Sequence, residues 1–117
     1  MDKNFPNGDK IDSTQANFGG KFKGSLKIGS FQPNGYGLYD MAGNAYEWVG
    51  DRYGTDYYAT LGTKVSNPQG PANGANRVLR GGSMLNDPIG MRVSVRYRDF
   101  PDDRNYYIGF RCARSSP

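Results

Sequence analysis

Residues 76–114 read NRVLRGGSMLNDPIGMRVSVRYRDFPDDRNYYIGFRCAR, and the rest of the chain can be organised around them. The first end, Val78–Ser83, alternates apolar and polar residues and stops at a glycine pair, which predicts a strand that runs into a sharp turn. The second end, Tyr107–Arg114, alternates again and predicts a second strand. Its inward-facing side chains would be Ile108, Phe110 and Cys112.

A long polar loop joins these two ends. It has about two dozen residues, and loops of that length in a small domain are usually functional. It contains four arginines and several aromatic residues of a kind often found at surfaces. The arginines are Arg92, Arg96, Arg98 and Arg104, and the aromatic residues are Tyr97, Phe100, Tyr106 and Tyr107. Residues 77–114 therefore form the predicted ligand-binding region.

The composition favours one small domain with short strands and much irregular backbone. A chain of 117 residues can bury a core without disulfides or metals. Seventeen glycines and seven prolines in a chain that is 36% apolar argue against long helices. We predict a single domain over residues 1–117, with a loosely held arm at residues 1–10.

Charge and hydropathy exclude several kinds of partner. The net charge is +4, and the basic residues of the final third are interleaved with aspartates. Interleaved signs favour ion pairs within the loop, so nucleic acid is not expected as a partner. No apolar run of membrane length and no leader is found, which predicts a soluble chain without membrane insertion, in an unidentified compartment. The single cysteine, Cys112, excludes an intrachain disulfide and is expected in the core.

Shorter patterns predict the elements before this region. Lys21–Phe31 alternates apolar residues with lysines and predicts an edge strand. A turn at Pro33-Asn34-Gly35 precedes a helical turn at Gly37–Met41 and a short strand at Ala45–Val49. The predicted core anchors of this block are Leu38, Tyr39, Tyr46 and Trp48.

Three sequence blocks carry a family resemblance. NGYGLYDMAGNAYEW (Asn34–Trp48), RVLRGGS (Arg77–Ser83) and IGFRCAR (Ile108–Arg114) resemble the formylglycine-generating, sulfatase-modifying-factor family. The resemblance implies an α+β, C-type-lectin-like fold with short antiparallel strands, few short helices and much irregular loop. The family domain is about twice as long, and the chain resembles roughly its second half.

The residues needed for catalysis are missing at the positions where the resemblance places them. The chain has no histidine, which excludes histidine-based acid-base and nucleophilic chemistry. The family oxidises a substrate cysteine with two copper-binding cysteines, whose positions here hold Asn86 and Met91. We therefore predict a protein that is not an enzyme and binds no copper. Ser83 is expected to cap the turn after the glycines.

The resemblance also implies a structural calcium site. Oxygen ligands at alternating positions suit this hard cation. The implied ligands are the side chains of Asp40 and Glu47 and the backbone carbonyls of Met41, Gly43 and Ala45. The alternative is that Asp40 caps a helical turn while Glu47 pairs with an arginine such as Arg80.

The long loop is the predicted ligand surface. Its arginines and prolines resemble the frame of variable proteins diversified by retroelements, some of which have this type of domain. Side chains of unrelated chemistry lie between them, and such mixtures suit binding of a protein or cell-surface ligand. The predicted ligand-binding residues are Leu85, Asn86, Asp87, Ile89, Gly90, Val93, Val95, Tyr97, Asp99, Phe100, Asp103, Asn105, Tyr106 and Tyr107.

Two alternatives to this function remain open. The same positions could be tolerant surface residues without a ligand. The chain could also be a divergent or truncated formylglycine-generating oxidoreductase that acts on a sulfatase cysteine.

Overall fold

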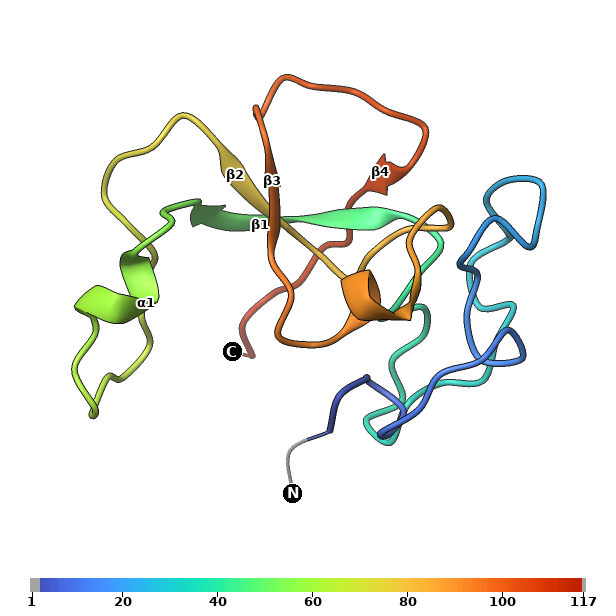
Figure 1. Cartoon of the computed structure of the whole chain (residues 1–117). Helices are drawn as coiled ribbons and strands as arrows, with labels where there is room; N and C mark the ends of the chain where they lie inside the picture. Colours follow the sequence, from blue (N-terminus) through green and yellow to red (C-terminus); the bar gives the residue numbers. More distant parts are fainter. Residues whose placement is uncertain (1–2, 117) are drawn as a thin grey trace.

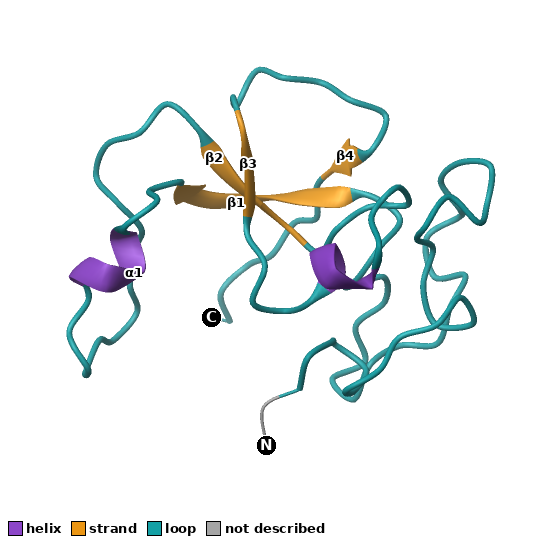
Figure 2. Cartoon of the chain, in the orientation of Figure 1, coloured by secondary structure: helices purple, strands orange, loops and turns teal. Residues whose placement is uncertain are grey.

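A small twisted sheet forms the centre of the computed structural model, which describes residues 3–116 (Figure 1). The sheet has the order β3-β2-β1-β4, so β3 and β4 lie at its edges. Its strands are β1 (Tyr46–Arg52), β2 (Arg77–Arg80), β3 (Tyr97–Asp99) and β4 (Ile108–Gly109). The helical elements are the one-turn α1 (Tyr57–Thr60) and the 3₁₀ helix η1 (Pro88–Met91). Most of the remaining chain is loop, as Figure 2 shows and as the glycine and proline content predicts.

The strand register decides which side chains share a face. β1 pairs antiparallel with β2, where Trp48 lies opposite Leu79, and β2 pairs antiparallel with β3, where Leu79 lies opposite Tyr97. Directly opposed residues point to the same side of a sheet. Val78 and Arg98 are likewise opposed, so Tyr97 and Arg98 point to opposite faces. β4 pairs parallel with β1 through Ile108 and Tyr46.

The glycine pair after β2 makes the predicted sharp turn. Gly81 and Gly82 have φ values of +92° and +70°, which glycine adopts at little cost. The turn brings the Gly81 carbonyl to the Gly43 N–H at 2.8 Å. A side chain at Gly43 would place its Cβ 2.4 Å from the Asn17 carbonyl oxygen, so the close approach of Gly43 to Asn17 requires glycine. The first two of the three sequence blocks therefore pack directly against each other.

The N-terminal segment is packed rather than loosely held. Phe5 is buried in an apolar cluster with Ala16, Ala42 and Met91. The Asn4 carbonyl accepts a hydrogen bond from the Val93 N–H at 2.9 Å. These contacts correct the prediction of a loose arm for residues 4–8, and residues 1 and 2 of that prediction lie outside the described part.

Two local elements expected before β1 do not form. Lys21–Phe31 is loop, because the Asn44 side chain satisfies the Leu26 backbone instead of a neighbouring strand. Asn44 Oδ1 accepts from the Leu26 N–H at 2.8 Å, and its Nδ2 donates to the Leu26 carbonyl at 3.2 Å. Gly37–Met41 is not helical, since Asp40 has a φ of +54° in the left-handed region. The predicted turn at Asn34 does form, with the Gly37 N–H donating to its carbonyl.

The chain after β4 leaves the sheet early. The predicted strand Tyr107–Arg114 is reduced to Ile108–Gly109, which finds ladder partners only at Tyr46 and Glu47. Phe110 is 77% exposed and Cys112 is also exposed, so their predicted core positions are wrong. Ile108 is half-buried.

Of the four core anchors predicted in Asn34–Trp48, two are at least half-buried and two are exposed. Tyr46 is buried and Trp48 half-buried, in a β1 strand that begins one residue after the predicted start at Ala45 and continues past Val49 to Arg52. Leu38 and Tyr39 are exposed instead, and they line an open groove of about 430 Å³ together with Phe110.

In the described part of the chain, no helix has the length and apolar character that crossing a membrane requires.

Candidate ligand-binding surface

The backbone of the 84–107 loop is tied to the rest of the domain. The Met84 N–H donates to the Asn44 carbonyl at 2.9 Å, and the Met84 carbonyl accepts from Gly20 at 2.8 Å. Farther along, the Arg80 guanidinium donates to the Val93 carbonyl at 2.7 Å. As Figure 1 shows, the loop leaves the end of β2, passes through η1 and β3, and returns over the sheet to β4. These anchors use backbone atoms of the loop at Met84 and Val93, so they do not depend on the side chains there.

Many of the predicted side chains point into solvent. The large apolar ones are between 48% (Val93) and 74% (Tyr106) exposed. The exposed set is Leu85, Asp87, Ile89, Val93, Tyr97, Phe100, Asp103, Asn105 and Tyr106. A fixed backbone with exposed large side chains is the arrangement that ligand contact requires.

The other predicted residues are half-buried and are partly engaged in the fold. They are Asn86, Gly90, Val95, Asp99 and Tyr107. Asn86 Oδ1 accepts from the N–H and the Oγ of Ser83, both at 2.9 Å, while its Nδ2 donates to the Tyr46 hydroxyl at 2.9 Å. The structure therefore gives Asn86 a bracing role in place of an open ligand contact. Ser83 also accepts from the Leu85 N–H through its Oγ, as expected for a turn cap.

The two positions where the resemblance places the family's copper-binding cysteines lie in different surroundings. Asn86 belongs to the hydrogen-bonded group just described, whereas Met91 is 1% exposed in the apolar cluster around Phe5. An amide and a thioether do not supply the thiolate pair that copper(I) requires. The Tyr46 hydroxyl contacts Asn86. Burial raises the pKa of Tyr46, and the hydrogen bond with Asn86 opposes this change.

Aromatic side chains gather on the Tyr46 face of the sheet. Tyr97 stacks on Tyr46 with ring centroids 5.4 Å apart, and Tyr106 packs edge-to-face on Tyr107 at 5.3 Å. One part of the Tyr97 ring thus packs on Tyr46, and the other part is exposed to solvent. Such ring pairs contribute about 0.5–1.5 kcal/mol beyond their buried area.

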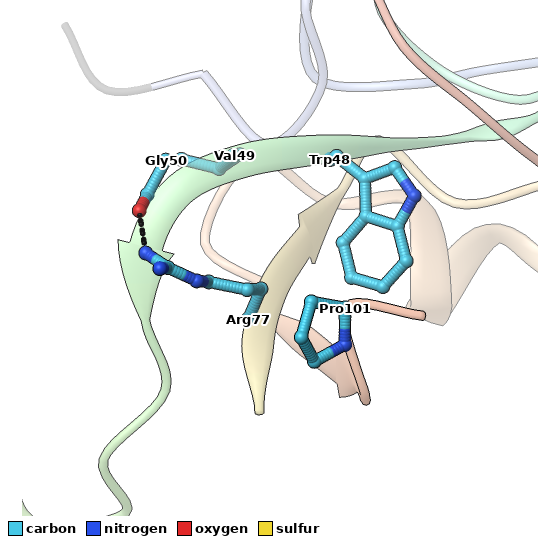
Figure 3. A pocket seen from close by; sticks show the side chains of 5 residues that line it. All are labelled: Trp48, Val49, Gly50, Arg77 and Pro101. Atoms are coloured by element: carbon cyan, nitrogen blue, oxygen red, sulfur yellow. Dashed lines mark hydrogen bonds between the residues drawn. The ribbon is translucent and has the colours of Figure 1, made fainter. Parts of the chain in front are cut away.

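An open slot lies on the same face next to the loop. Trp48 and Pro101 face each other across it in Figure 3, and the Arg77 guanidinium turns away to donate to the Gly50 carbonyl at 2.6 Å. Its volume is about 210 Å³. The slot could receive a small apolar side chain of a ligand.

The opposite face carries a feature that the sequence analysis missed. The Arg96 guanidinium lies 4.1 Å from the ring centre of Tyr58 and 5.2 Å from that of Tyr53, and Arg98 lies 4.7 Å from that of Tyr53. These four residues are named the arginine–tyrosine stack. The alternation of Arg96 and Arg98 places both on one side of β3, but nothing in the sequence identifies their tyrosine partners about forty residues earlier.

Two acidic residues of the loop also meet. A hydrogen bond with Asp99 is the main cause that raises the pKa of Asp103 above its ordinary value, and burial and the charge of Asp99 add to it. The Asp99 side chain also accepts from the Phe100 N–H at 3.0 Å. The loop thus holds negative charge near the arginine–tyrosine stack, and within residues 3–116 no ion pair joins the two.

Four of the five predicted calcium ligands, Asp40, Gly43, Ala45 and Glu47, line one groove, but both carboxylates already have partners. Glu47 accepts two hydrogen bonds of 2.6 Å from Arg111, so it pairs with an arginine as the alternative predicts, although with Arg111 and not with Arg80. The Asp40 side chain accepts from the Gly29 N–H at 2.7 Å and caps no helix, while the Asp40 carbonyl accepts from Arg111 at 3.1 Å. The Glu47 contact raises the pKa of Arg111. The oxygen chemistry suits calcium, but Arg111 already holds the Glu47 carboxylate and the Gly29 N–H already donates to the Asp40 carboxylate.

The fold and these blocks define a C-type-lectin-like domain of the sulfatase-modifying-factor type. A family model described as a sulfatase-modifying factor enzyme 1-like domain matches residues 1–116, and the chain belongs to this family.

Known relatives differ widely in their names. The serine/threonine-protein kinase pkn1 of Chlamydia pneumoniae is 43% identical over 111 residues, which are 95% of this chain and 18% of that protein. The formylglycine-generating enzyme of Streptomyces coelicolor is 44% identical over 92 residues, 76% of this chain and 29% of that protein. The structure of Treponema denticola variable protein 1 matches with a TM-score of 0.79 and 31% identity, over 94% of this chain and 40% of that one. The chain thus spans less than half of each of these relatives.

Proposed function

We propose that this domain is a non-enzymatic ligand-binding module of the kind used as the variable protein of a diversity-generating retroelement. The 84–107 loop displays its side chains to a protein or cell-surface ligand. The observation that carries the proposal is the contrast between the anchored loop backbone and side chains such as Phe100 and Tyr106, which are 56% and 74% exposed. The likeness to Treponema denticola variable protein 1 supports the same function.

The contacts of Asn86 and Met91 favour a binding role over the family's oxidation chemistry. Asn86 braces the turn at Ser83, and Met91 fills the core. Restoring thiolates there would remove both contacts. The similarity to a formylglycine-generating enzyme supports the second candidate, an oxidoreductase acting on a sulfatase cysteine.

A binding experiment with matched variants tests the first candidate. The labelled domain is titrated onto intact candidate cells, and Phe100→Ala and Tyr106→Ala are each expected to weaken saturable binding about tenfold, as for interface anchors worth about 1.4 kcal/mol. Tyr36→Ala is the control, because Tyr36 is 89% exposed but lies outside the loop. The thermal midpoints should stay within about 2 °C, since surface changes cost little.

Three results would contradict the proposal. The first is unfolding of the domain by Phe100→Ala and Tyr106→Ala, which would make these aromatics core residues. The second is equal weakening by Tyr36→Ala. The third is an aldehyde formed on a sulfatase-derived cysteine peptide incubated with the domain, copper and oxygen, which would establish the oxidoreductase.

A further inference from the structure

The arginine–tyrosine stack holds two positive charges that no ion pair within residues 3–116 neutralises. The ion pair found in that part of the chain joins Arg111 to Glu47, away from Arg96 and Arg98 in the sequence. An aromatic ring attracts a guanidinium through its quadrupole but carries no net charge. Arg80 adds a third guanidinium next to the stack, since it donates to the Tyr58 hydroxyl at 3.3 Å. Three guanidinium groups therefore lie together here, beside the Asp99 side of the same cavity.

Stacking also prepares the arginines for a particular kind of partner. A guanidinium packed face-on against a ring keeps its N–H groups free at the edge, in the plane where a carboxylate binds with two hydrogen bonds. Arg96 is held against two rings, Tyr58 and Tyr53. Less side-chain entropy is then lost on binding than for a mobile surface arginine.

The surroundings of the stack favour a peptide over a uniformly anionic polymer. A cavity of about 230 Å³ next to Arg96 and Arg98 is also lined by Tyr97, Phe100 and Asp99. The exposed rings offer apolar contacts that a sulfated glycan or a nucleic acid backbone would use poorly. The carboxylates of Asp99 and Asp103 would repel a continuous row of anions.

The place of β3 in the sheet points in the same direction. β3 lies at the edge of the sheet, where an extended segment can align beside it.

We propose that the arginine–tyrosine stack binds an acidic peptide segment of the partner protein, with its carboxylates received by Arg96 and Arg98. This inference rests on the proposed function and names the chemistry of the ligand. The segment combines Asp or Glu with apolar side chains that contact Phe100. Its binding weakens as salt screens the charges.

A random dodecapeptide phage library selected on the intact chain tests the inference. The wild type should enrich peptides with Asp or Glu, and a fluorescent copy of an enriched peptide should bind at least tenfold more weakly to the Arg96→Gln/Arg98→Gln variant. The Lys64→Gln/Arg114→Gln variant removes the same charge from exposed positions elsewhere and should bind like the wild type. Arg96→Lys keeps the charge but loses the planar fork, so it should also weaken binding. Circular dichroism confirms that each variant is folded.

The outcomes separate this inference from the proposed function. Enriched peptides without acidic residues, or acidic peptides that bind the Arg96→Gln/Arg98→Gln variant equally well, would overturn the acidic-segment inference alone. Tighter binding of a heparin hexasaccharide than of any enriched peptide, with the same dependence on Arg96 and Arg98, would replace the peptide with a sulfated glycan. Peptides that never depend on Phe100, Tyr106 or the stack would overturn both proposals.

Discussion

Arg111 holds the carboxylate of Glu47 through two hydrogen bonds of 2.6 Å, although 64 residues separate them. The same guanidinium reaches the Asp40 carbonyl at 3.1 Å. It thereby connects the block before β1 to the chain just after β4. A positive side chain thus occupies the Glu47 carboxylate, one of the oxygen ligands that the family resemblance assigns to calcium, and it also contacts the backbone of Asp40.

Calcium binding by this chain stays a prediction, and Arg111 makes it testable. We expect excess chelator to leave the thermal midpoint of the wild type unchanged, because the guanidinium already supplies the positive charge. Arg111→Gln removes that charge, and millimolar calcium should then raise the midpoint of the variant by mass action. Scanning calorimetry with chelator and with calcium measures both effects.

The control for this prediction is Arg111→Gln/Glu47→Gln, which lacks the carboxylate and should not respond to calcium. A wild-type midpoint that falls in chelator would instead show that calcium displaces Arg111. The five ligands predicted from the sequence would then be supported as a site.

Asn86→Ala should destabilise the domain by about 1–3 kcal/mol, the usual cost of leaving a buried donor unsatisfied. The reason is that the Ser83 N–H and Oγ lose their acceptor, and Ser83 is only 1% exposed. Tyr46→Phe removes only the hydroxyl that Asn86 Nδ2 contacts and should cost less. Urea unfolding measures both variants. Equal stability of Asn86→Ala and the wild type would contradict the bracing role and would leave the ligand role predicted from the sequence as the explanation for Asn86.

The parts of the fold with strong local signals could be predicted from the sequence. The glycine pair at 81 and 82 predicts the turn after β2 because the backbone there needs positive φ. Apolar alternation correctly predicts β2, and the turn signals before Ala45 correctly predict that a strand follows there. The same alternation fails at Lys21–Phe31, where the Asn44 side chain satisfies the backbone, and after Gly109, where the ladder ends. Alternation shows which side chains share a face but not whether a partner strand exists.

The candidate surface shows a similar division. Sequence reasoning correctly predicts that side chains such as Phe100 and Tyr106 are exposed, because large side chains in a polar loop without periodicity have no face to bury. It does not reveal that Asn86 is engaged with Ser83, or that Tyr53 and Tyr58 hold Arg96. These contacts depend on how segments far apart in the chain are folded against one another.

Asp103→Asn should raise the thermal midpoint at pH 7, because the pKa of Asp103 is raised by its contact with Asp99. A carboxyl whose pKa is higher in the folded chain than in the unfolded one stabilises the fold fully below the unfolded pKa of about 3.9, and this stabilisation is lost as pH rises through the folded value. As pH rises through the folded value, the ionised Asp103 carboxylate can no longer donate to Asp99, whereas the amide that replaces it would still donate. The advantage of the variant should vanish near pH 3, where Asp103 is protonated in both states. Asp102→Asn is the matched control, since Asp102 is the weakest contributor to the shift. Thermal melts followed by circular dichroism between pH 3 and 7 measure the difference, and parallel curves for Asp103→Asn and the wild type would show that the two carboxyls do not interact in solution.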